Sequence, residues 1–153
     1  MPSDILEAWK KNCEVNYLLL DGIPAKAMAD QYTPRTRTVA AQFAHVHNVR
    51  IYQLKHRAPK RLGSLKTFER GAQPTGAQLK KALKVSDKAV ASMLAEFEAA
   101  GKVRGWKGSP VSYLGYFLAH EGHHRALTLV CLRFGGTKMP DSIKYGIWDA
   151  WRK

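Results

Sequence analysis

Two histidines four positions apart are the residues of this chain whose spacing most clearly suggests chemistry. His120 and His124 lie in the segment AHEGHHRALTLVCLRF. On a helix, residues four apart lie on one face about one turn from each other, so two imidazole nitrogens can reach the same ion. A bare pair of this kind more often forms hydrogen bonds to carbonyls or carboxylates, so a metal site requires a third ligand.

The two histidines also fall in an apolar pattern with steps of three and four residues. Its members are Phe117, His120, His124, Leu127, Cys131 and Phe134. This spacing predicts a continuous buried face with two imidazoles in its middle. Since a buried imidazole needs a hydrogen-bond partner or a metal to offset its desolvation, we expect both histidines to face the core with such partners.

The segment QFAHVHNVR offers two candidates for a third ligand, His45 and His47, which point to nearly opposite sides of a helix. The face of His47 also carries Phe43, Ile51 and Leu54. The face of His45 carries Ala41, Gln42, Val49 and Tyr52. Periodicity slightly favours His47 as the third ligand, but the pattern alone leaves the choice open.

Three neighbours of the histidine pair, Glu121, His123 and Arg125, are further candidates for residues that orient the ligands, although no catalytic residue can be assigned. Glu121 projects about 100° away from His120, which suits either a residue that orients a ligand or an ordinary helix-face carboxylate. Arg125 either binds an anionic group of a substrate or cofactor, or is a surface arginine. Cys131 is more typical of a packed small residue than of a nucleophile.

Four long helices are expected to position these residues, so the predicted fold is an all-α four-helix bundle. The apolar periodicity and the glycines and prolines place them at about 4–20, 36–55, 76–100 and 111–134. Residues 58–75 are expected to form a long connection. The ending YGIWDAWRK predicts a short helix or turn that lays Ile147, Trp148 and Trp151 against the bundle. The length of 153 residues fits a single domain spanning residues 1–153.

Composition gives expectations for the cellular compartment, the state of the cysteines and the kinds of partner. Cys13 and Cys131 are too few for a disulfide framework, and neither a secretory leader nor a membrane span is evident, so we expect reduced thiols in a cytoplasmic protein without membrane association. The net charge of +13 makes nucleic acid a conceivable partner. Trp148 and Trp151 would suit a homodimer interface, although core packing explains them equally well.

The rival interpretation is a DNA- or RNA-binding protein with a winged-helix-like segment at 76–107. Val85 and Ser86 would form its turn, a recognition helix would begin at Asp87, and KVRGW would be a strand. The residues proposed to contact phosphates are Lys80, Lys81, Lys84, Lys88 and Arg104. This interpretation leaves the histidines unexplained, and no wing hairpin follows Trp106, so it is the alternative rather than the preferred prediction.

Three motifs together resemble the DinB/YfiT-like superfamily of metal-dependent enzymes. They are TVAAQFAHVHNVR, AHEGHHRALTLVCLRFGG and the terminal YGIWDAW. The resemblance selects His45 over His47 as first ligand, because the family's ligand follows a Thr-Val pair by seven residues, here Thr38 and Val39. His123 and Arg125 match the family's HHR, whereas Ala126 stands where many members have glycine.

The resemblance implies one divalent metal ion, with zinc, nickel and iron not distinguished, held by His45, His120 and His124. Three protein ligands with an open position are typical of a catalytic site rather than a structural one. The resemblance further implies a small-molecule substrate and a low-molecular-weight thiol such as bacillithiol or mycothiol. The expected activity is therefore that of a thiol-dependent S-transferase or isomerase.

Overall fold

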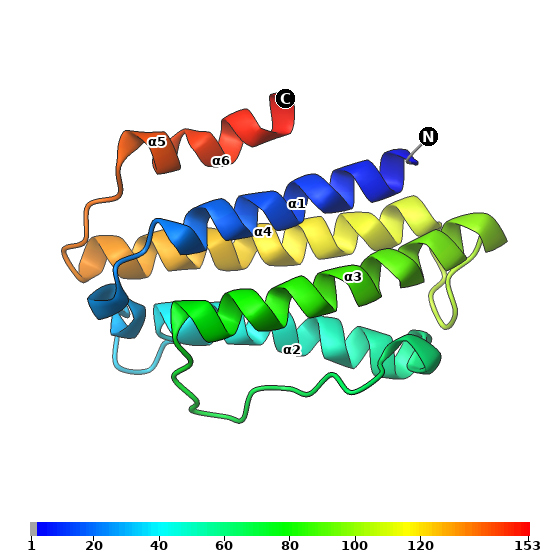
Figure 1. The fold of residues 1–153 in the computed structure, drawn as a ribbon, viewed down its shortest axis with the longest axis horizontal. Helices are drawn as coiled ribbons and strands as arrows, with labels where there is room; N and C mark the ends of the chain where they lie inside the picture. The colour runs from blue at the N-terminus through cyan, green and yellow to red at the C-terminus, as the bar shows by residue number, and fades with distance from the viewer. Residues whose placement is uncertain (1–2) are drawn as a thin grey trace.

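Four long helices account for most of the chain in the computed structural model, which describes residues 3–153 (Figure 1). They are α1 (Asp4–Asp21), α2 (Val39–Arg57), α3 (Gly76–Ala100) and α4 (Pro110–Phe134). No strand occurs between residues 3 and 153. The predicted all-α bundle is therefore confirmed. None of its helices is both long and apolar enough to cross a membrane.

Each long helix begins immediately after a serine or threonine that caps it. The side chains of Ser3, Thr38, Thr75 and Ser109 accept hydrogen bonds from backbone N–H groups three residues further on. These bonds satisfy donors that the first turn of a helix leaves free. Capping explains why α2 begins at Val39 rather than at the predicted Thr36. At the other end of α3, Gly101 adopts a left-handed φ of 65° and terminates the helix.

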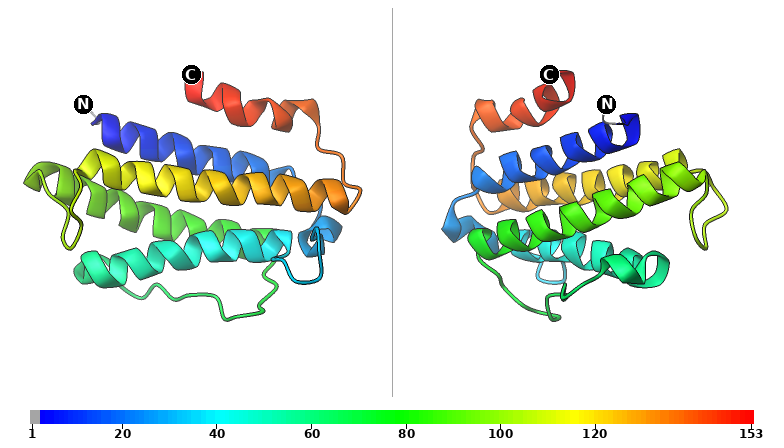
Figure 2. Two further views of the ribbon diagram at one scale, coloured as in Figure 1. Left: turned by 180° about the vertical axis from the view of Figure 1, so that it is seen from behind. Right: turned by 45° about the vertical axis from the view of Figure 1, so that its right-hand side comes forward.

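The helices are arranged so that α1 and α2 each pack against both α3 and α4 (Figures 1 and 2). Their apolar faces form two clusters, one at each end of the bundle. The first includes Leu19, Phe43, Val46, Leu83 and Leu132. The second includes Trp9, Leu54, Val90, Met93 and Phe117. Along each helix, buried polar residues lie between the members of these clusters, so a polar layer separates the two halves of the core.

The C-terminal segment forms two short helices, α5 (Asp141–Lys144) and α6 (Gly146–Asp149), which lie along α1 (Figure 2). Ile147 is buried against the bundle, as predicted. Trp148 is 66% exposed, so the prediction for that residue is wrong. A helix of four residues presents only one face to its neighbour, and the residue after Ile147 is turned about 100° away from that face.

The winged-helix interpretation is wrong about the structure of 76–107. It required a turn at Val85 and Ser86 and a strand at KVRGW. Helix α3 continues without interruption through Val85 and Ser86, because no glycine or proline occurs between its first residue and its C-terminal glycine. Ser86 is fully buried and its hydroxyl donates to the Leu83 carbonyl at 3.2 Å. The segment 102–107 forms turns rather than a strand.

The connection between α2 and α3 contains one short 3-10 helix, η2 (Pro59–Arg61), and otherwise runs irregularly beside α2 (Figure 1). Polar contacts attach it to that helix. Asn48 accepts a hydrogen bond from the Phe68 amide at 2.8 Å and donates one to the Phe68 carbonyl at 2.9 Å. Residues 69–73 are thereby held over the first half of α2, where they line a pocket.

Candidate metal centre

Three imidazoles from two helices converge beside the polar layer. His45 comes from α2, His120 and His124 come from α4, and one ring nitrogen of each lies within 4.8 Å of the other two. The Nε2 atoms of His45 and His120 are 3.3 Å apart. A tetrahedral ion with metal–nitrogen distances of 2.0–2.1 Å separates its ligand nitrogens by about 3.3 Å. The spacing of this pair therefore fits a shared ion.

His124 is oriented by Gln42, a buried residue of α2. The Nδ1–H of His124 donates to the Gln42 Oε1 at 2.7 Å, because an amide oxygen can only accept. The lone pair of His124 Nε2 is then available to an ion, which is the usual arrangement of a metal-binding histidine. Sequence reasoning placed Gln42 only on the face of His45; its position three residues before a candidate ligand was the available signal.

His120 is placed by packing rather than by conventional hydrogen bonds. Its ring stacks on Tyr116, with centroids 6.0 Å apart. Its Nδ1 is buried and has no hydrogen-bond partner within residues 3–153. Apart from His45 Nε2, nothing in this part of the chain satisfies the ring nitrogens of His120, so a shared ion would offset part of the cost of burying the imidazole.

The alternative ligand His47 lies outside this group. Its Nδ1 is 3.1 Å from the Ser86 hydroxyl and its Nε2 is 3.0 Å from the Lys66 carbonyl. Both ring nitrogens therefore already have partners from α3 and the connection. Apolar periodicity slightly favoured His47 as the ligand, but this residue is buried as a hydrogen-bonded core residue, and His45 is the histidine of α2 that joins the group.

Burial keeps the clustered imidazoles neutral. Desolvation, with Arg37 and His120 adding charge repulsion, lowers the pKa of His45 to about 4. Desolvation and the neighbouring His120 and His45 lower the pKa of His124 to about 3. The pKa of His120 is also lowered, mainly by burial. Neutral imidazoles at pH 7 have the free lone pair that a metal ligand requires.

The metal-free protein is expected to lose stability as the pH falls below about 6.5. Below that value the unfolded histidines bind protons, whereas His45 and His124 in the folded protein stay neutral until about pH 4 and 3. Protons then favour the unfolded state. Urea unfolding in the presence of a chelator, between pH 7 and 5, measures this loss. A His45→Ala variant should show a shallower pH dependence, and an equal or steeper one would contradict the assignment.

The predicted buried face of α4 needs a correction. Phe134 is 71% exposed and Leu127 is only partly buried. The buried face of α4 instead consists of Phe117, Glu121, His124, Thr128 and Cys131. Because α4 packs against both α1 and α2, its buried face is rotated toward Glu121, and His120 lies at the edge of that face.

Glu121 belongs to the polar layer rather than to the histidine group or to an exposed helix face. Its carboxylate accepts from Arg50 Nε at 2.7 Å and from the side-chain amides of Asn12 and Asn16 at 2.6 and 2.7 Å. Burial alone would raise the pKa of Glu121, but the charge of Arg50 and these hydrogen bonds lower it. Within residues 3–153 the carboxylate makes no hydrogen bond to the three histidines. The idea that it orients a ligand is therefore not supported.

The other two candidate residues, Arg125 and His123, lie outside the group of three clustered histidines. Arg125 donates to the Oδ1 atoms of Asn12 and Asn16, at 2.8 and 2.7 Å. Arg125 is therefore part of the polar layer. Its guanidinium group is already hydrogen-bonded there, so it is neither a free anion-binding group nor a simple surface arginine. His123 is exposed on α4, next to His124. Neither side chain reaches the pocket described next.

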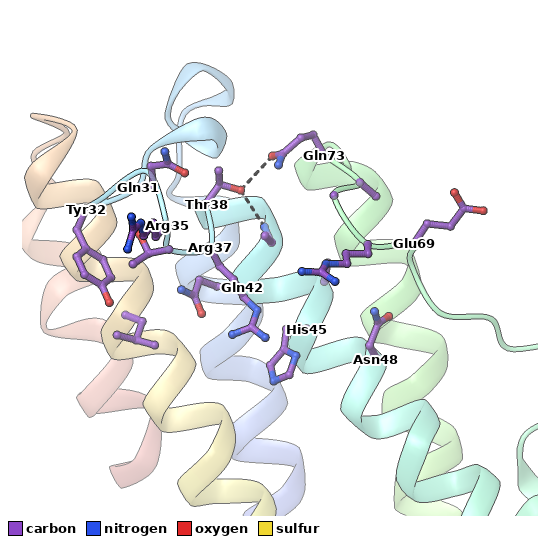
Figure 3. A pocket seen from close by; sticks show the side chains of 17 residues that line it. Gln31, Tyr32, Arg35, Arg37, Thr38, Gln42, His45, Asn48, Glu69 and Gln73 are labelled. Carbon is purple, nitrogen blue, oxygen red and sulfur yellow. Dashed lines mark hydrogen bonds between the residues drawn. The ribbon is translucent and has the colours of Figure 1, made fainter.

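Of the three clustered histidines, His45 lines a pocket of about 830 Å³ (Figure 3). His45 and Gln42 lie on its α2 side and Leu127 on its α4 side. Its remaining walls come from residues 31–38, before α2, and residues 69–73 of the connection. A volume of this size is typical of sites that enclose a small molecule.

Comparison with known proteins agrees with the sequence motifs. The family model of the DinB superfamily matches residues 11–128, which include all three clustered histidines. No curated protein matched the chain. The match covers most of the chain and parts of all four long helices, so this protein belongs to the DinB superfamily.

Proposed function

We propose that His45, His120 and His124 hold one divalent metal ion and that the protein is a thiol-dependent S-transferase or isomerase. The observation that carries the proposal is the convergence of three neutral imidazoles, one of which, that of His45, lines a pocket large enough for a small molecule. Superfamily membership supports the metal site. The thiol is the cosubstrate that the family resemblance implies.

The donor set favours a catalytic rather than a structural role. Structural zinc usually has four protein ligands, whereas three leave a position for a substrate. Zinc, nickel and iron all accept imidazole ligands. When bound, the ion would supply positive charge that lowers the pKa of a thiol or water and so makes it a better nucleophile.

Other residues of the chain hold the candidate ligands and the pocket walls in place. Gln42 keeps the Nδ1 proton on His124, so that Nε2 faces the group. The backbone carbonyl of Arg37 accepts a contact from Cys131 Sγ at 3.5 Å, which attaches the segment before α2 to α4. Residues of the segments 31–38 and 69–73 form the pocket walls next to His45.

Elemental analysis of the purified, untagged protein tests the proposal. We expect about one metal ion per chain in the wild type and almost none in His45→Ala. His47→Ala is the matched control, because His47 lies on the same helix and is buried but uses both ring nitrogens elsewhere. Equal metal content in both variants, or none in the wild type after reconstitution, would exclude the site.

The same samples test the activity. Metal-loaded wild type is expected to accelerate transfer of a low-molecular-weight thiol to an electrophile, and His45→Ala is expected to lose that acceleration. If the metal-loaded wild type binds its ion but transfers no thiol, the metal site stands and the thiol chemistry is rejected.

A further inference from the structure

Three arginines at the pocket beside His45 have no side-chain partner within residues 3–153. Arg35, Arg37 and Arg70 line the pocket and are exposed. Within residues 3–153 their guanidinium groups form no ion pair and no hydrogen bond. The same lining contains one carboxylate, Glu69. The walls therefore carry more positive than negative charge.

A comparison with the other arginines shows that the unpaired guanidinium groups are concentrated at this pocket. Half of the ten arginines use their guanidinium groups within the described chain, namely Arg50, Arg57, Arg61, Arg125 and Arg152. Of the five that do not, three line this single pocket, and Arg104 and Arg133 lie elsewhere. Unpaired cations repel one another, so their convergence favours an anionic occupant.

One of the three arginines lies next to a candidate ligand. Figure 3 shows the guanidinium group of Arg37 beside the imidazole of His45. Arg70 comes from the connection and lines the same pocket. Arg37 also contributes, after burial, to the low pKa of His45. Arg35 lies farther away, beside Tyr32 (Figure 3).

The two segments that carry these arginines are joined across the pocket. The Thr38 hydroxyl donates to Gln73 Oε1 at 3.0 Å, which connects the start of α2 to the connection (Figure 3). Thr38 also caps α2 through the Ala41 amide. Arg37 and Arg70 therefore come from two segments that are fixed to each other and that line the same pocket.

We propose that this pocket binds the anionic group of a small molecule, a carboxylate or a phosphate ester, through the guanidinium groups of Arg37 and Arg70. Guanidinium groups bind both kinds of group through paired, charge-assisted hydrogen bonds. The pocket would hold the rest of the molecule beside His45, which lines it. The inference rests on the proposed function only in assigning this molecule as the thiol or its acceptor.

Calorimetric titration of the metal-free protein at low ionic strength tests the anion site without the metal. The probes are sodium succinate and inorganic phosphate, and the tighter of the two identifies the preferred anion. We expect Arg37→Gln and Arg70→Gln each to weaken binding about tenfold, which corresponds to loss of one charge-assisted hydrogen bond. Arg104→Gln is the matched control, an exposed and unpaired arginine at the opposite end of the bundle, and should bind like wild type.

A second titration relates the anion site to the metal. In the cobalt-loaded protein, mercaptosuccinate should change the metal absorption at about tenfold lower concentration than 2-mercaptoethanol, because carboxylates add contacts to the arginines. Arg37→Gln should retain its cobalt, by elemental analysis, but lose this preference. Mercaptosuccinate without an advantage in wild type would overturn the inference for carboxylates.

The outcomes separate this inference from the proposed function. Failure of both succinate and phosphate to bind, or equal weakening in all three variants, would overturn the anion site even in a protein that binds metal. Arginine-dependent anion binding by a protein that takes up no metal would support the anion site while rejecting the proposed function.

Discussion

Glu121→Gln is expected to lower the free energy of unfolding by about 3–5 kcal/mol, the range for breaking one partner of a buried ion pair. The side chains of Glu121 and Arg50 are each only 1% exposed, and Arg50 Nε lies 2.7 Å from Glu121 Oε1. The substitution keeps the size of the side chain but removes its charge. Arg50 would then remain buried without a carboxylate, and Arg125 would lose the nearby negative charge that favours its protonated form.

Urea unfolding of the metal-free protein, followed by far-ultraviolet circular dichroism, measures this change. Glu96→Gln is the matched control, because Glu96 pairs with Arg61 at 3.3 Å while both side chains are about half exposed. Exposed pairs contribute little, so this control should change the free energy of unfolding by less than about 1 kcal/mol. Similar small losses in both variants would show that the polar layer does not stabilise the fold as proposed.

His124→Ala is expected to abolish stabilisation of the fold by metal. A ligand that binds only the folded state adds about 4 kcal/mol when its free concentration is a thousand times its dissociation constant. Wild type should therefore gain several kcal/mol on addition of zinc and lose them to a chelator. The variant has only two of the three clustered imidazoles, so its unfolding should depend little on zinc.

Chemical unfolding with and without zinc measures the stabilisation by metal in the wild type and in His124→Ala. His123→Ala is the control, since His123 is adjacent in sequence but exposed, and this variant should keep the full response to metal. If His124→Ala gained as much from zinc as wild type, His124 would not be a ligand. If His123→Ala lost the response as well, the effect would not be specific to the clustered imidazoles.

Local sequence was sufficient for the features that depend on one helix at a time. The apolar periodicity and the glycine and proline positions predicted all four long helices, and the spacing of His120 and His124 predicted that two imidazoles share one region of α4. These features repeat with the period of a helix, so nearby residues alone determine them. The family motifs added His45, which periodicity could not choose over His47.

Only the tertiary structure decided which residues meet across the bundle. His47 faces Ser86 and the connection, Gln42 reaches His124, and Glu121 pairs with Arg50 from another helix. The rotation of α4 that buries Glu121 depends on its simultaneous packing against α1 and α2. Likewise, Arg37 and Arg70 share a pocket because the connection lies over the start of α2. Such contacts join residues tens of positions apart, and the pattern within a single helix contains no information about them.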